Sequence, residues 1–289
     1  MEGGAVKKPV AVLGGGTMGH GVAQVAAQAG YPTRLYDVDP DAANRALRRI
    51  RRNLDKGVDL GKVQESTREK TLSHVQAVPR LEDALDGVAL VVEAVPEKLS
   101  LKLEILRRVE PQVAESAVLA TNTSSLSVDA LAEGLQRPGR FLGLHFFNPV
   151  HIMALVEVVR GSATEPDVLE RALHFVREIG KEPVVVKDSP GFASSRLGVA
   201  LGLEAMRMVE EGVAEAEDID RVLELGYRHP MGPLKLSDLV GLDVRLGIAE
   251  YLHGELGQEH FRPPKILRRM VQEGKLGRKS GEGFYRWED

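Results

Sequence analysis

The stretch Pro9–Asp37, PVAVLGGGTMGHGVAQVAAQAGYPTRLYD, decides the fold of this chain. A short apolar run, Pro9–Leu13, leads into glycines, and small and apolar residues then recur at helical spacing until Gly30. A second apolar run, Thr33–Asp37, follows the helical pattern. The order predicts strand, glycine turn, helix and strand, and such a βαβ unit predicts a parallel sheet.

The first two-thirds of the chain repeat this alternation of short apolar runs and helical patterns. Strands that are buried on both faces of a parallel sheet read as nearly continuous apolar runs. By this criterion we expect further strands at Val88–Val95, Ala117–Asn122, Phe141–Phe147, Ala154–Val159 and Pro183–Asp188. Helical spacing predicts helices over Asp41–Leu54 and Leu101–Val109.

The pattern changes after Asp188. From there on, apolar residues recur at helical spacing over Ala193–Glu211, Ala216–Leu225, Leu236–Leu252 and Lys265–Glu273. We therefore expect an α/β fold in which a Rossmann-like dinucleotide-binding domain, residues 1–188, is followed by an all-α C-terminal domain, residues 189–289.

The composition limits the classes of partner. A chain of 289 residues with 43% hydrophobic residues can bury a large core, whereas its net charge of −4 argues against a nucleic-acid partner. The sequence lacks a run of about 18 apolar residues, so we expect no membrane partner. The N-terminal residues reach glycine before a signal-peptide segment could form, and we expect a cytoplasmic protein.

The sequence contains no cysteine. This excludes disulfides, thiolate nucleophiles and cysteine-based metal sites, and we expect no bound metal ion. A catalytic base must therefore come from another residue type.

The glycine turn predicts a dinucleotide site. Gly14, Gly16 and Gly19 form G-x-G-x-x-G between the expected strand and helix, where the first permits a tight turn, the second admits a pyrophosphate and the third allows close packing. Asp37 ends the next strand, where a carboxylate accepts hydrogen bonds from ribose hydroxyls and repels a 2′-phosphate. The pattern favours NAD over NADP. The alternative is a merely structural turn, with Asp37 capping the helix near Asp41.

A histidine and a glutamate interrupt the apolar strands within GLHFFNPVHIMALVEVV, Gly143–Val159. If these strands pair antiparallel around His151, residues whose numbers add to the same sum lie opposite each other, which places His145 across from Glu157. A carboxylate there would fix the imidazole tautomer and stabilise its cation, making His145 a general base for oxidation of an alcohol. The alternative is a core histidine neutralised by a buried acid.

The sequence resembles that of a known protein family. The motifs VLGGGTMGHGVA, VVEAVPEKLSLK, ATNTSSLSV, GLHFFNPV with LVEVV, DSPGF, HPMGPLKLSDLVGLD and GRKSGEGFY occur in order along nearly the whole chain. Together they resemble the short-form L-3-hydroxyacyl-CoA dehydrogenases, which include the 3-hydroxybutyryl-CoA dehydrogenases. The resemblance implies reversible NAD-dependent oxidation of (S)-3-hydroxyacyl-CoA to 3-oxoacyl-CoA by a homodimer formed through the C-terminal helical domain.

The resemblance also implies roles for individual residues. His145 is implied as the catalytic base, Glu157 as its orienting partner and Ser124 as a hydroxyl that reaches the substrate oxygen and the nicotinamide. The positions that match NAD contacts are Gly14, Gly16, Thr17, Met18, Gly19, Asp37, Glu93, Lys98, Ser124, Asn148 and Lys279. Ser124 could instead cap the following helix, Glu93 could form a structural ion pair, and Lys98 and Lys279 could be surface charges.

Substrate contacts are implied at Ser124, Ser195, Asn53, Lys56 and Lys62. Ser195 stands in PGFASSR where the family commonly has asparagine, and a hydroxyl has a shorter reach and one donor where an amide has two. Asn53, Lys56 and Lys62 belong to an arginine-rich segment that could bind the phosphates of coenzyme A. For most of these arginines the pattern favours a solvated helix face instead.

Two other functions remain open at the level of the sequence. A related NAD-dependent dehydrogenase could act on a free hydroxy acid or sugar acid, since the same histidine and glutamate can oxidise any suitably placed secondary alcohol. A non-catalytic NAD-binding protein is the third hypothesis, and it leaves the His145 and Glu157 pair without a purpose.

Overall fold

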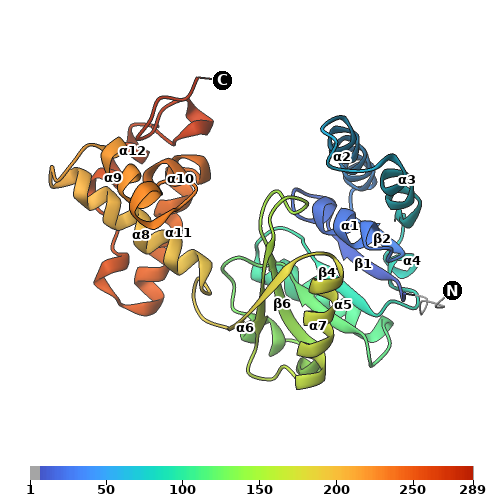
Figure 1. Cartoon of the computed structure of the whole chain (residues 1–289). Helices are drawn as coiled ribbons and strands as arrows, with labels where there is room; N and C mark the ends of the chain where they lie inside the picture. The colour runs from blue at the N-terminus through green and yellow to red at the C-terminus, as the bar shows by residue number, and fades with distance from the viewer. Residues whose placement is uncertain (1–6, 289) are drawn as a thin grey trace. The chain divides into compact units, whose positions relative to one another are not determined.

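The computed structural model describes residues 7–288. The first six residues, on which the expectation about a signal peptide partly depends, lie outside the described part. The chain divides into two compact units, Met1–Asp188 and Ser189–Asp289. Figure 1 shows the first unit in blue to yellow and the second in yellow to red.

The N-terminal unit contains one sheet of eight strands in the described residues, in the order β3-β2-β1-β4-β5-β6-β7-β8. The strands are β1 (Val10–Leu13), β2 (Thr33–Tyr36), β3 (Val75–Ala77), β4 (Leu90–Glu93), β5 (Val118–Thr121), β6 (Phe141–Phe146), β7 (Leu155–Arg160) and β8 (Glu182–Lys187). Neighbouring strands run parallel except β6 and β7, which pair antiparallel.

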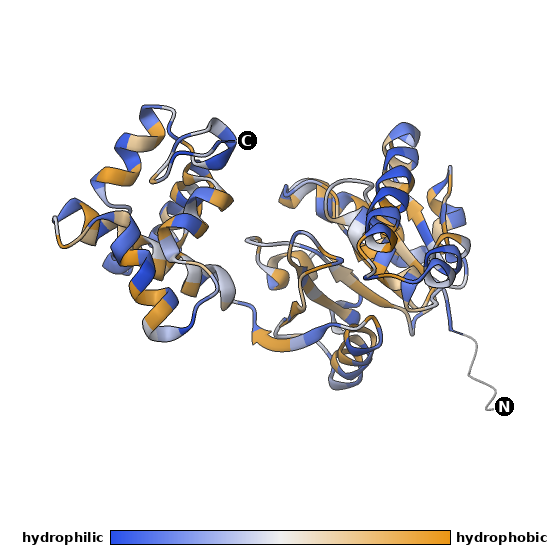
Figure 2. Ribbon diagram, turned by 45° about the horizontal axis from the view of Figure 1, so that its top comes forward, coloured by the Kyte–Doolittle hydropathy of each residue, from blue (hydrophilic) through white to orange (hydrophobic). Residues whose placement is uncertain are grey.

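Helices cover the sheet and leave its central strands buried. They are α1 (Gly19–Gln28), α2 (Pro40–Asp59), α3 (Glu65–His74), α4 (Leu81–Leu85), α5 (Leu99–Val109), α6 (Val128–Ala132) and α7 (Pro166–Glu178). Val12 of β1, Val22 of α1 and Val176 of α7 belong to one hydrophobic core, while the alternate strand residues Ala11 and Leu13 are buried as well. Figure 2 shows these hydrophobic strands inside the unit. Burial on both faces explains the nearly continuous apolar runs.

Helix α2 begins with a capped end and is longer than the sequence predicts. The Asp39 side chain accepts a hydrogen bond from the Asp41 N–H, and Pro40 occupies the first turn, where its missing N–H costs nothing. The helix is strongly charged. Within residues 7–288, no helix is long and apolar enough to cross a membrane.

The C-terminal unit is helical, which confirms the predicted fold class of a Rossmann-like domain followed by an all-α domain. It contains α8 (Ser194–Glu210), α9 (Ala216–Arg221), which continues into a π-helical turn (Val222–Gly226), α10 (Pro233–Val240), α11 (Leu242–Leu256) and α12 (Lys265–Gln272). Its core includes the fully or almost fully buried residues Leu203, Met206, Leu234, Leu242, Leu252, Phe261 and Leu267.

The prediction of one helix over Leu236–Leu252 is wrong. Gly241 has φ 105°, outside the helical region, and separates α10 from α11. A residue with a side chain adopts this conformation only with strain, so the glycine permits the break.

Candidate active site

A crevice of about 730 Å³ lies in the N-terminal unit, where β1, β2, β4, β5 and β6 end. Ligands of open α/β sheets bind outside the carboxyl ends of the strands, at the point where the strand order reverses. Here β1 lies between β2 and β4 and supplies that point. The polar and glycine residues at the crevice include Gly14, Gly16, Thr17, Asp37, Glu97, Asn122, Ser124, His145 and Asn148.

The three glycines of the turn have different surroundings. A Cβ on Gly14 would lie 2.6 Å from the Ala94 carbonyl oxygen, and one on Gly19 would lie 1.8 Å from the Gly14 carbonyl oxygen. A Cβ on Gly16 would meet nothing within 4 Å. Gly14 and Gly19 are therefore needed for packing, whereas Gly16 borders open space at the start of α1, where helix N–H groups favour a phosphate. This geometry fits a dinucleotide.

Asp37 is fixed beside the same turn. Its Oδ2 accepts from the Gly15 N–H at 2.7 Å and its Oδ1 accepts from the Asp39 N–H at 2.9 Å. The alternative of Asp37 as the cap of α2 is wrong, because Asp39 caps that helix. Asp37 lines the crevice, where its charge can meet ribose hydroxyls and disfavours a 2′-phosphate.

His145 and Glu157 face each other across β6 and β7 in the register that the sequence predicts. The Nδ1 of His145 lies 2.8 Å from Oε2 of Glu157, and the two residues are 7% and 1% exposed. The ring centroids of His145 and Phe147 lie 4.5 Å apart. Because the histidine also lines the crevice, a carboxylate-oriented imidazole borders the dinucleotide site.

Comparison with known proteins decides the family. The model of the 3-hydroxyacyl-CoA dehydrogenase NAD-binding domain matches residues 9–189, and that of the C-terminal domain of the same family matches residues 191–287. The chain belongs to the 3-hydroxyacyl-CoA dehydrogenase family. The predictions of an NAD-dependent 3-hydroxyacyl-CoA dehydrogenase and of NAD as cofactor are confirmed at this level.

Individual relatives match nearly the whole chain. A probable 3-hydroxybutyryl-CoA dehydrogenase of Bacillus subtilis is 42% identical over 98% of both chains, and the mitochondrial hydroxyacyl-coenzyme A dehydrogenase of Sus scrofa is 41% identical over 97% of this chain and 91% of its own. The crystal structure of (S)-3-hydroxybutyryl-CoA dehydrogenase from Ralstonia eutropha has a TM-score of 0.93 at 36% identity, covering 99% of this chain and 100% of its own.

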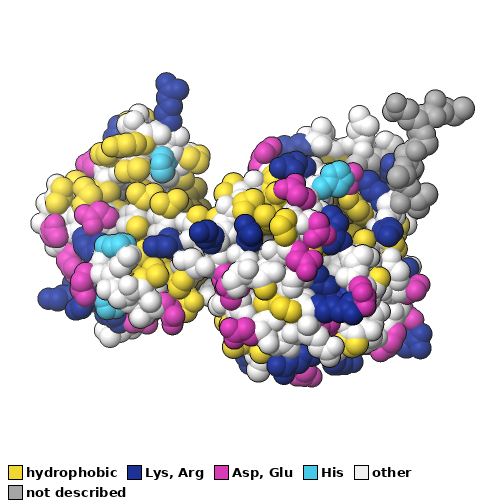
Figure 3. Space-filling model, turned by 90° about the horizontal axis from the view of Figure 1, so that it is seen from below, with side chains coloured by type: hydrophobic (Ala, Val, Ile, Leu, Met, Phe, Trp, Pro, Cys, Tyr) yellow, Lys and Arg dark blue, Asp and Glu magenta, His cyan; other side chains and the backbone are white. Residues whose placement is uncertain are grey.

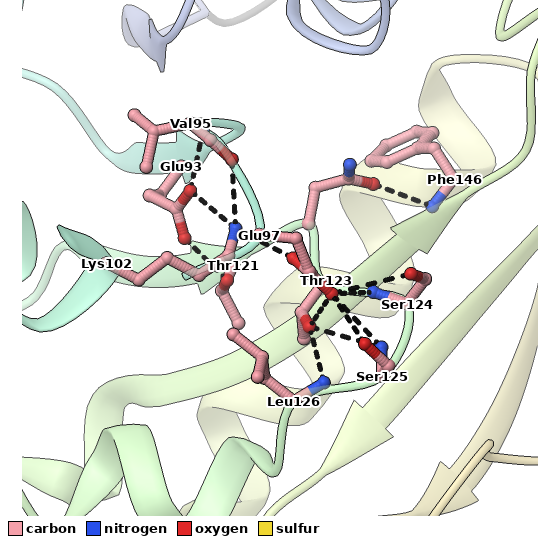
Figure 4. Close-up of polar contacts among 11 residues, drawn as sticks. Glu93, Val95, Glu97, Lys102, Thr121, Thr123, Ser124, Ser125, Leu126 and Phe146 are labelled. Atoms are coloured by element: carbon pink, nitrogen blue, oxygen red, sulfur yellow. Dashed lines mark hydrogen bonds and ion pairs between the residues drawn. The ribbon is translucent and has the colours of Figure 1, made fainter. Parts of the chain in front are cut away.

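Ser124 of this dehydrogenase lies in the loop after β5 and lines the crevice. Its backbone N–H donates to Glu97 Oε1 at 2.8 Å (Figure 4), and the cap of the following helix α6 is Ser127. The alternative of Ser124 as that cap is therefore wrong. The nearby Asn122 accepts from the Phe146 N–H at 3.0 Å, which ties this loop to the strand that carries His145.

The predicted contact of Glu93 with NAD does not fit the structure. The residue is 0% exposed and does not border the crevice. Its carboxylate instead accepts from Lys102 Nζ at 2.8 Å, from the Val95 N–H at 2.7 Å and from Thr121 Oγ1 at 2.6 Å. Because β4 is buried on both faces, its last side chain is buried too. Glu93 therefore forms a structural ion pair with Lys102 and not a cofactor contact.

Glu97 takes the place in the crevice that the sequence assigned to Glu93. It follows β4 by four residues and carries its carboxylate into the loop region, whereas the predicted Lys98 is an exposed residue just before α5 and does not line the crevice. A signal was present in the sequence, because VVEAVPEK contains a second acid after the strand and ligands bind in the loops that follow strands.

The residues predicted to contact coenzyme A lie on and after α2. The Asn53 amide donates to Gln24 Oε1 of α1 at 3.0 Å, and Lys56 and Lys62 are exposed. Arg48 and Arg51 line a smaller depression of about 300 Å³ at α2, α3 and β3. Asn53 is thus engaged in helix packing, while the cations face solvent.

Ser195 and Lys279 belong to the C-terminal unit. Ser195 is half-buried in the first turn of α8. The Nζ of Lys279 donates to Asp243 Oδ2 at 2.6 Å, at the start of α11. Their predicted contacts with substrate and cofactor remain predictions, since the crevice described above is formed by the N-terminal unit.

Proposed function

We propose that the chain oxidises (S)-3-hydroxyacyl-CoA to 3-oxoacyl-CoA with NAD⁺, reversibly, with His145 as general base. The observation that carries this proposal is the buried contact between His145 and Glu157 on the wall of the dinucleotide crevice. A nicotinamide enzyme that oxidises an alcohol needs a base for the hydroxyl proton, and a histidine titrates in the range where it can accept it.

The roles of the protein groups follow from this geometry. Glu157 accepts from Nδ1–H of His145, so the proton from the C3 hydroxyl is received at Nε2. The carboxylate then stabilises the imidazolium that forms. We assign to the Ser124 hydroxyl a hydrogen bond to the substrate oxygen, which holds that oxygen as its charge develops.

The cofactor is held by the N-terminal unit. The turn from Gly14 to Gly19, with Thr17 and Met18 between, receives the pyrophosphate, and Asp37 receives the adenosine ribose. Asn148 lines the crevice near His145 and is proposed to contact the nicotinamide end. When NAD⁺ is bound, its nicotinamide accepts the hydride from C3 of the substrate.

Coenzyme A requires cations for its phosphates. Lys56 and Lys62 are exposed beside the arginine-rich helix α2, and we propose that this segment receives them. Ser195 is proposed to contact the acyl part through its hydroxyl, which supplies one donor.

The dehydrogenase is proposed to be a cytoplasmic homodimer. Support for the dimer comes from exposed apolar side chains on neighbouring helices of the C-terminal unit: Leu197 and Leu201 on α8, and Leu236, Leu239 and Val240 on α10. Figure 3 shows apolar side chains on the surface of this unit. Such clusters are typical of protein interfaces. Cell fractionation tests the location.

Reduction of acetoacetyl-CoA, followed by NADH absorbance, tests the function. We expect turnover with acetoacetyl-CoA and little with free acetoacetate. Preference for the free acid would support a hydroxy-acid dehydrogenase instead, and NADH binding without turnover on any 3-oxoacyl-CoA would support a non-catalytic protein. A series of acyl chain lengths then defines the preferred substrate.

A further inference from the structure

The C-terminal unit buries an arginine side chain that has no anionic partner. Arg245 of α11 is 7% exposed, and its Nε is buried without a hydrogen-bond partner. No carboxylate in residues 7–288 compensates the guanidinium, and burial lowers the pKa of Arg245 to about 10. The group is therefore still charged at neutral pH. A buried charge without a partner is strongly unfavourable, so the position of this cation calls for an explanation.

The buried carboxylates of the same unit are engaged with other donors. Asp220 and Asp238 each accept hydrogen bonds from two backbone N–H groups and from an aromatic side chain. Asp243, two positions before Arg245, accepts from Lys279 Nζ at 2.6 Å. These acids do not neutralise Arg245, so an anion from outside the unit is needed to compensate its charge.

A glycine makes room for the guanidinium against α8. A Cβ on Gly198 would lie 3.2 Å from Nη1 and 3.9 Å from Nη2 of Arg245, so a side chain there would crowd the cation. Helices α8 and α11 pack against each other within the unit (Figure 1). Ser195 lies three positions before Gly198, on the same face of α8 and about 4.5 Å away along the helix axis. The cation thus lies on the face of α8 that carries the proposed contact with the acyl part.

We propose that Arg245 binds a carboxylate at the end of the acyl chain, so that the dehydrogenase acts on 3-hydroxyacyl-CoA esters of dicarboxylic acids. This inference rests on the proposed function, in which Ser195 contacts the acyl part. A guanidinium binds a carboxylate through two parallel N–H···O bonds, which are strong in a buried site. A carboxyl carbon three bonds beyond C3 lies about 4 Å from it, close to the rise of α8 between Ser195 and Gly198. The substrate then supplies the counter-ion that the free protein lacks.

Two matched pairs of substrates test the inference. At six and at eight acyl carbons, the 3-oxoacyl-CoA that ends in a carboxylate is compared with the one that ends in a methyl group, and turnover is followed by NADH absorbance. We expect the kcat/KM of the wild type to favour the carboxylate at least tenfold at one of these lengths, because hydrogen bonds between charged groups are strong. The absence of a preference at both lengths would overturn the inference.

Arg245→Met should remove the preference and retain the reaction. We expect kcat/KM for the favoured carboxylate substrate to fall at least tenfold, and kcat/KM for its methyl-ended counterpart to stay within threefold. Arg245→Lys keeps the charge and loses the paired geometry of the guanidinium, so we expect an intermediate preference. A wild-type preference in Arg245→Met would show that the carboxylate is bound elsewhere.

A leucine at Gly198 changes the space around the cation without altering any charge. In Gly198→Leu the Cβ alone would lie 3.2 Å from Nη1, so we expect the guanidinium to be displaced and the carboxylate preference to fall severalfold. Gly247→Leu is the matched control, because Gly247 is an exposed residue of α11 where a Cβ would meet nothing within 4 Å. Equal preferences in the two variants would contradict a carboxylate site beside Gly198.

Thermal unfolding and light scattering distinguish a ligand site from a structural role. Replacing an uncompensated buried charge by an apolar side chain is often neutral or stabilising, so we expect the Tm of Arg245→Met to equal or exceed that of the wild type. A lower Tm with an unchanged substrate preference would show that the cation only supports packing. Loss of the dimer with an unchanged preference would assign the missing anion to a second copy of the chain.

Unreactive esters give a readout that does not depend on turnover. Adipyl-CoA and suberyl-CoA are compared with hexanoyl-CoA and octanoyl-CoA by calorimetric titration in the presence of NADH. We expect one of the two dicarboxylic esters to bind the wild type at least tenfold more tightly than its methyl-ended counterpart, and Arg245→Met to bind both members of that pair equally. If no 3-oxoacyl-CoA is turned over, the proposed function fails, yet the titration still tests the carboxylate site. Equal affinities within both pairs in the wild type would overturn the inference on their own.

Discussion

The Nδ1 of His145 lies 2.8 Å from Oε2 of Glu157, across the antiparallel strands β6 and β7. A carboxylate only accepts hydrogen bonds, so this contact places the neutral imidazole proton on Nδ1. Both residues are fixed by strand backbone and nearly excluded from solvent. The orientation of the proposed base is therefore set by the fold itself.

Replacing the base should separate binding from chemistry. For His145→Gln we expect kcat to fall by roughly 10²- to 10⁴-fold, the usual contribution of a general base, because the amide does not accept the hydroxyl proton. The affinity for NADH should stay within about twofold, since the turn and Asp37 are intact. Fluorescence titration and steady-state kinetics measure the two quantities. Near-normal turnover would contradict the role of His145.

Replacing Glu157 by glutamine should keep His145 in place and remove the negative charge beside it. In Glu157→Gln the amide oxygen can still accept from Nδ1–H, but the imidazolium that forms during oxidation loses its neighbouring negative charge. We expect a lower kcat and a shifted pH dependence of turnover. A pH series of kcat on both proteins checks this, and an unchanged profile with unchanged kcat would mean that the pair is structural.

Asp37 should set the choice between NAD and NADP. Asp37→Asn keeps an oxygen acceptor beside the Gly15 N–H and removes the charge that repels a 2′-phosphate. We expect kcat/KM for NAD to fall by about tenfold, because hydrogen bonds to a charged group are roughly twice as strong as neutral ones, and the ratio of NADP to NAD activity to rise. Equal ratios in variant and wild type would rule out Asp37 as the discriminating group.

The ionisation of Glu97 should make its contribution to stability depend on pH. Burial raises the pKa of this carboxyl, but hydrogen bonds from Thr123 and the charge of Lys102, with the backbone N–H groups of Ser124 and Ser125, outweigh it, so its pKa lies below the ordinary value. The ionised form thus stabilises the fold above the ordinary pKa, and this contribution is lost as pH falls through the lowered folded pKa.

Urea denaturation of the wild type and Glu97→Gln checks that dependence. Their difference in unfolding free energy should be constant above about pH 5 and shrink toward pH 3. A difference that grows on acidification would contradict the assigned direction of the pKa.

The apolar face of the C-terminal unit should carry the subunit contact. Leu201 of α8 is 43% exposed, and Leu201→Asp would bury a charge in the proposed dimer interface. We expect this variant to be monomeric by light scattering after gel filtration. The matched control is Leu60→Asp at the end of α2, where the leucine is 58% exposed. A dimeric Leu201→Asp would place the interface elsewhere.

The features that the sequence predicts are those governed by local periodicity. The apolar runs predict the buried strands β1, β4, β5 and β6 because both faces of the sheet are covered there, whereas the run Pro183–Asp188 forms β8, whose Val184 and Val185 are exposed. The pairing of His145 with Glu157 follows from the regular register of two antiparallel strands. Periodicity fails at Gly241, since apolar spacing continues across it while its φ of 105° ends the helix. It also misses β3, which has only three residues.

The hydrogen bonds and ion pairs around Glu97 could not be predicted from the sequence for another reason. Glu93 ends an apolar strand and reads as a ligand contact, yet its partner Lys102 comes from a helix where a lysine reads as a surface residue. Each charge is explained only by the other, and their contact depends on how α5 packs behind β4. That information is tertiary, so neither residue could be placed from its own segment.

The β6–β7 hairpin also has a consequence for the order of folding. His145 and Glu157 are separated by twelve positions, so closing one hairpin brings them together, an event of about 1–10 μs in isolated hairpins. The crevice takes its walls from Leu13 at one extreme and Asn148 at the other, so it needs the long-range pairing of parallel strands, which is slower. We therefore expect the His145–Glu157 pair to form in the local part of the folding reaction, and the crevice to be assembled around it.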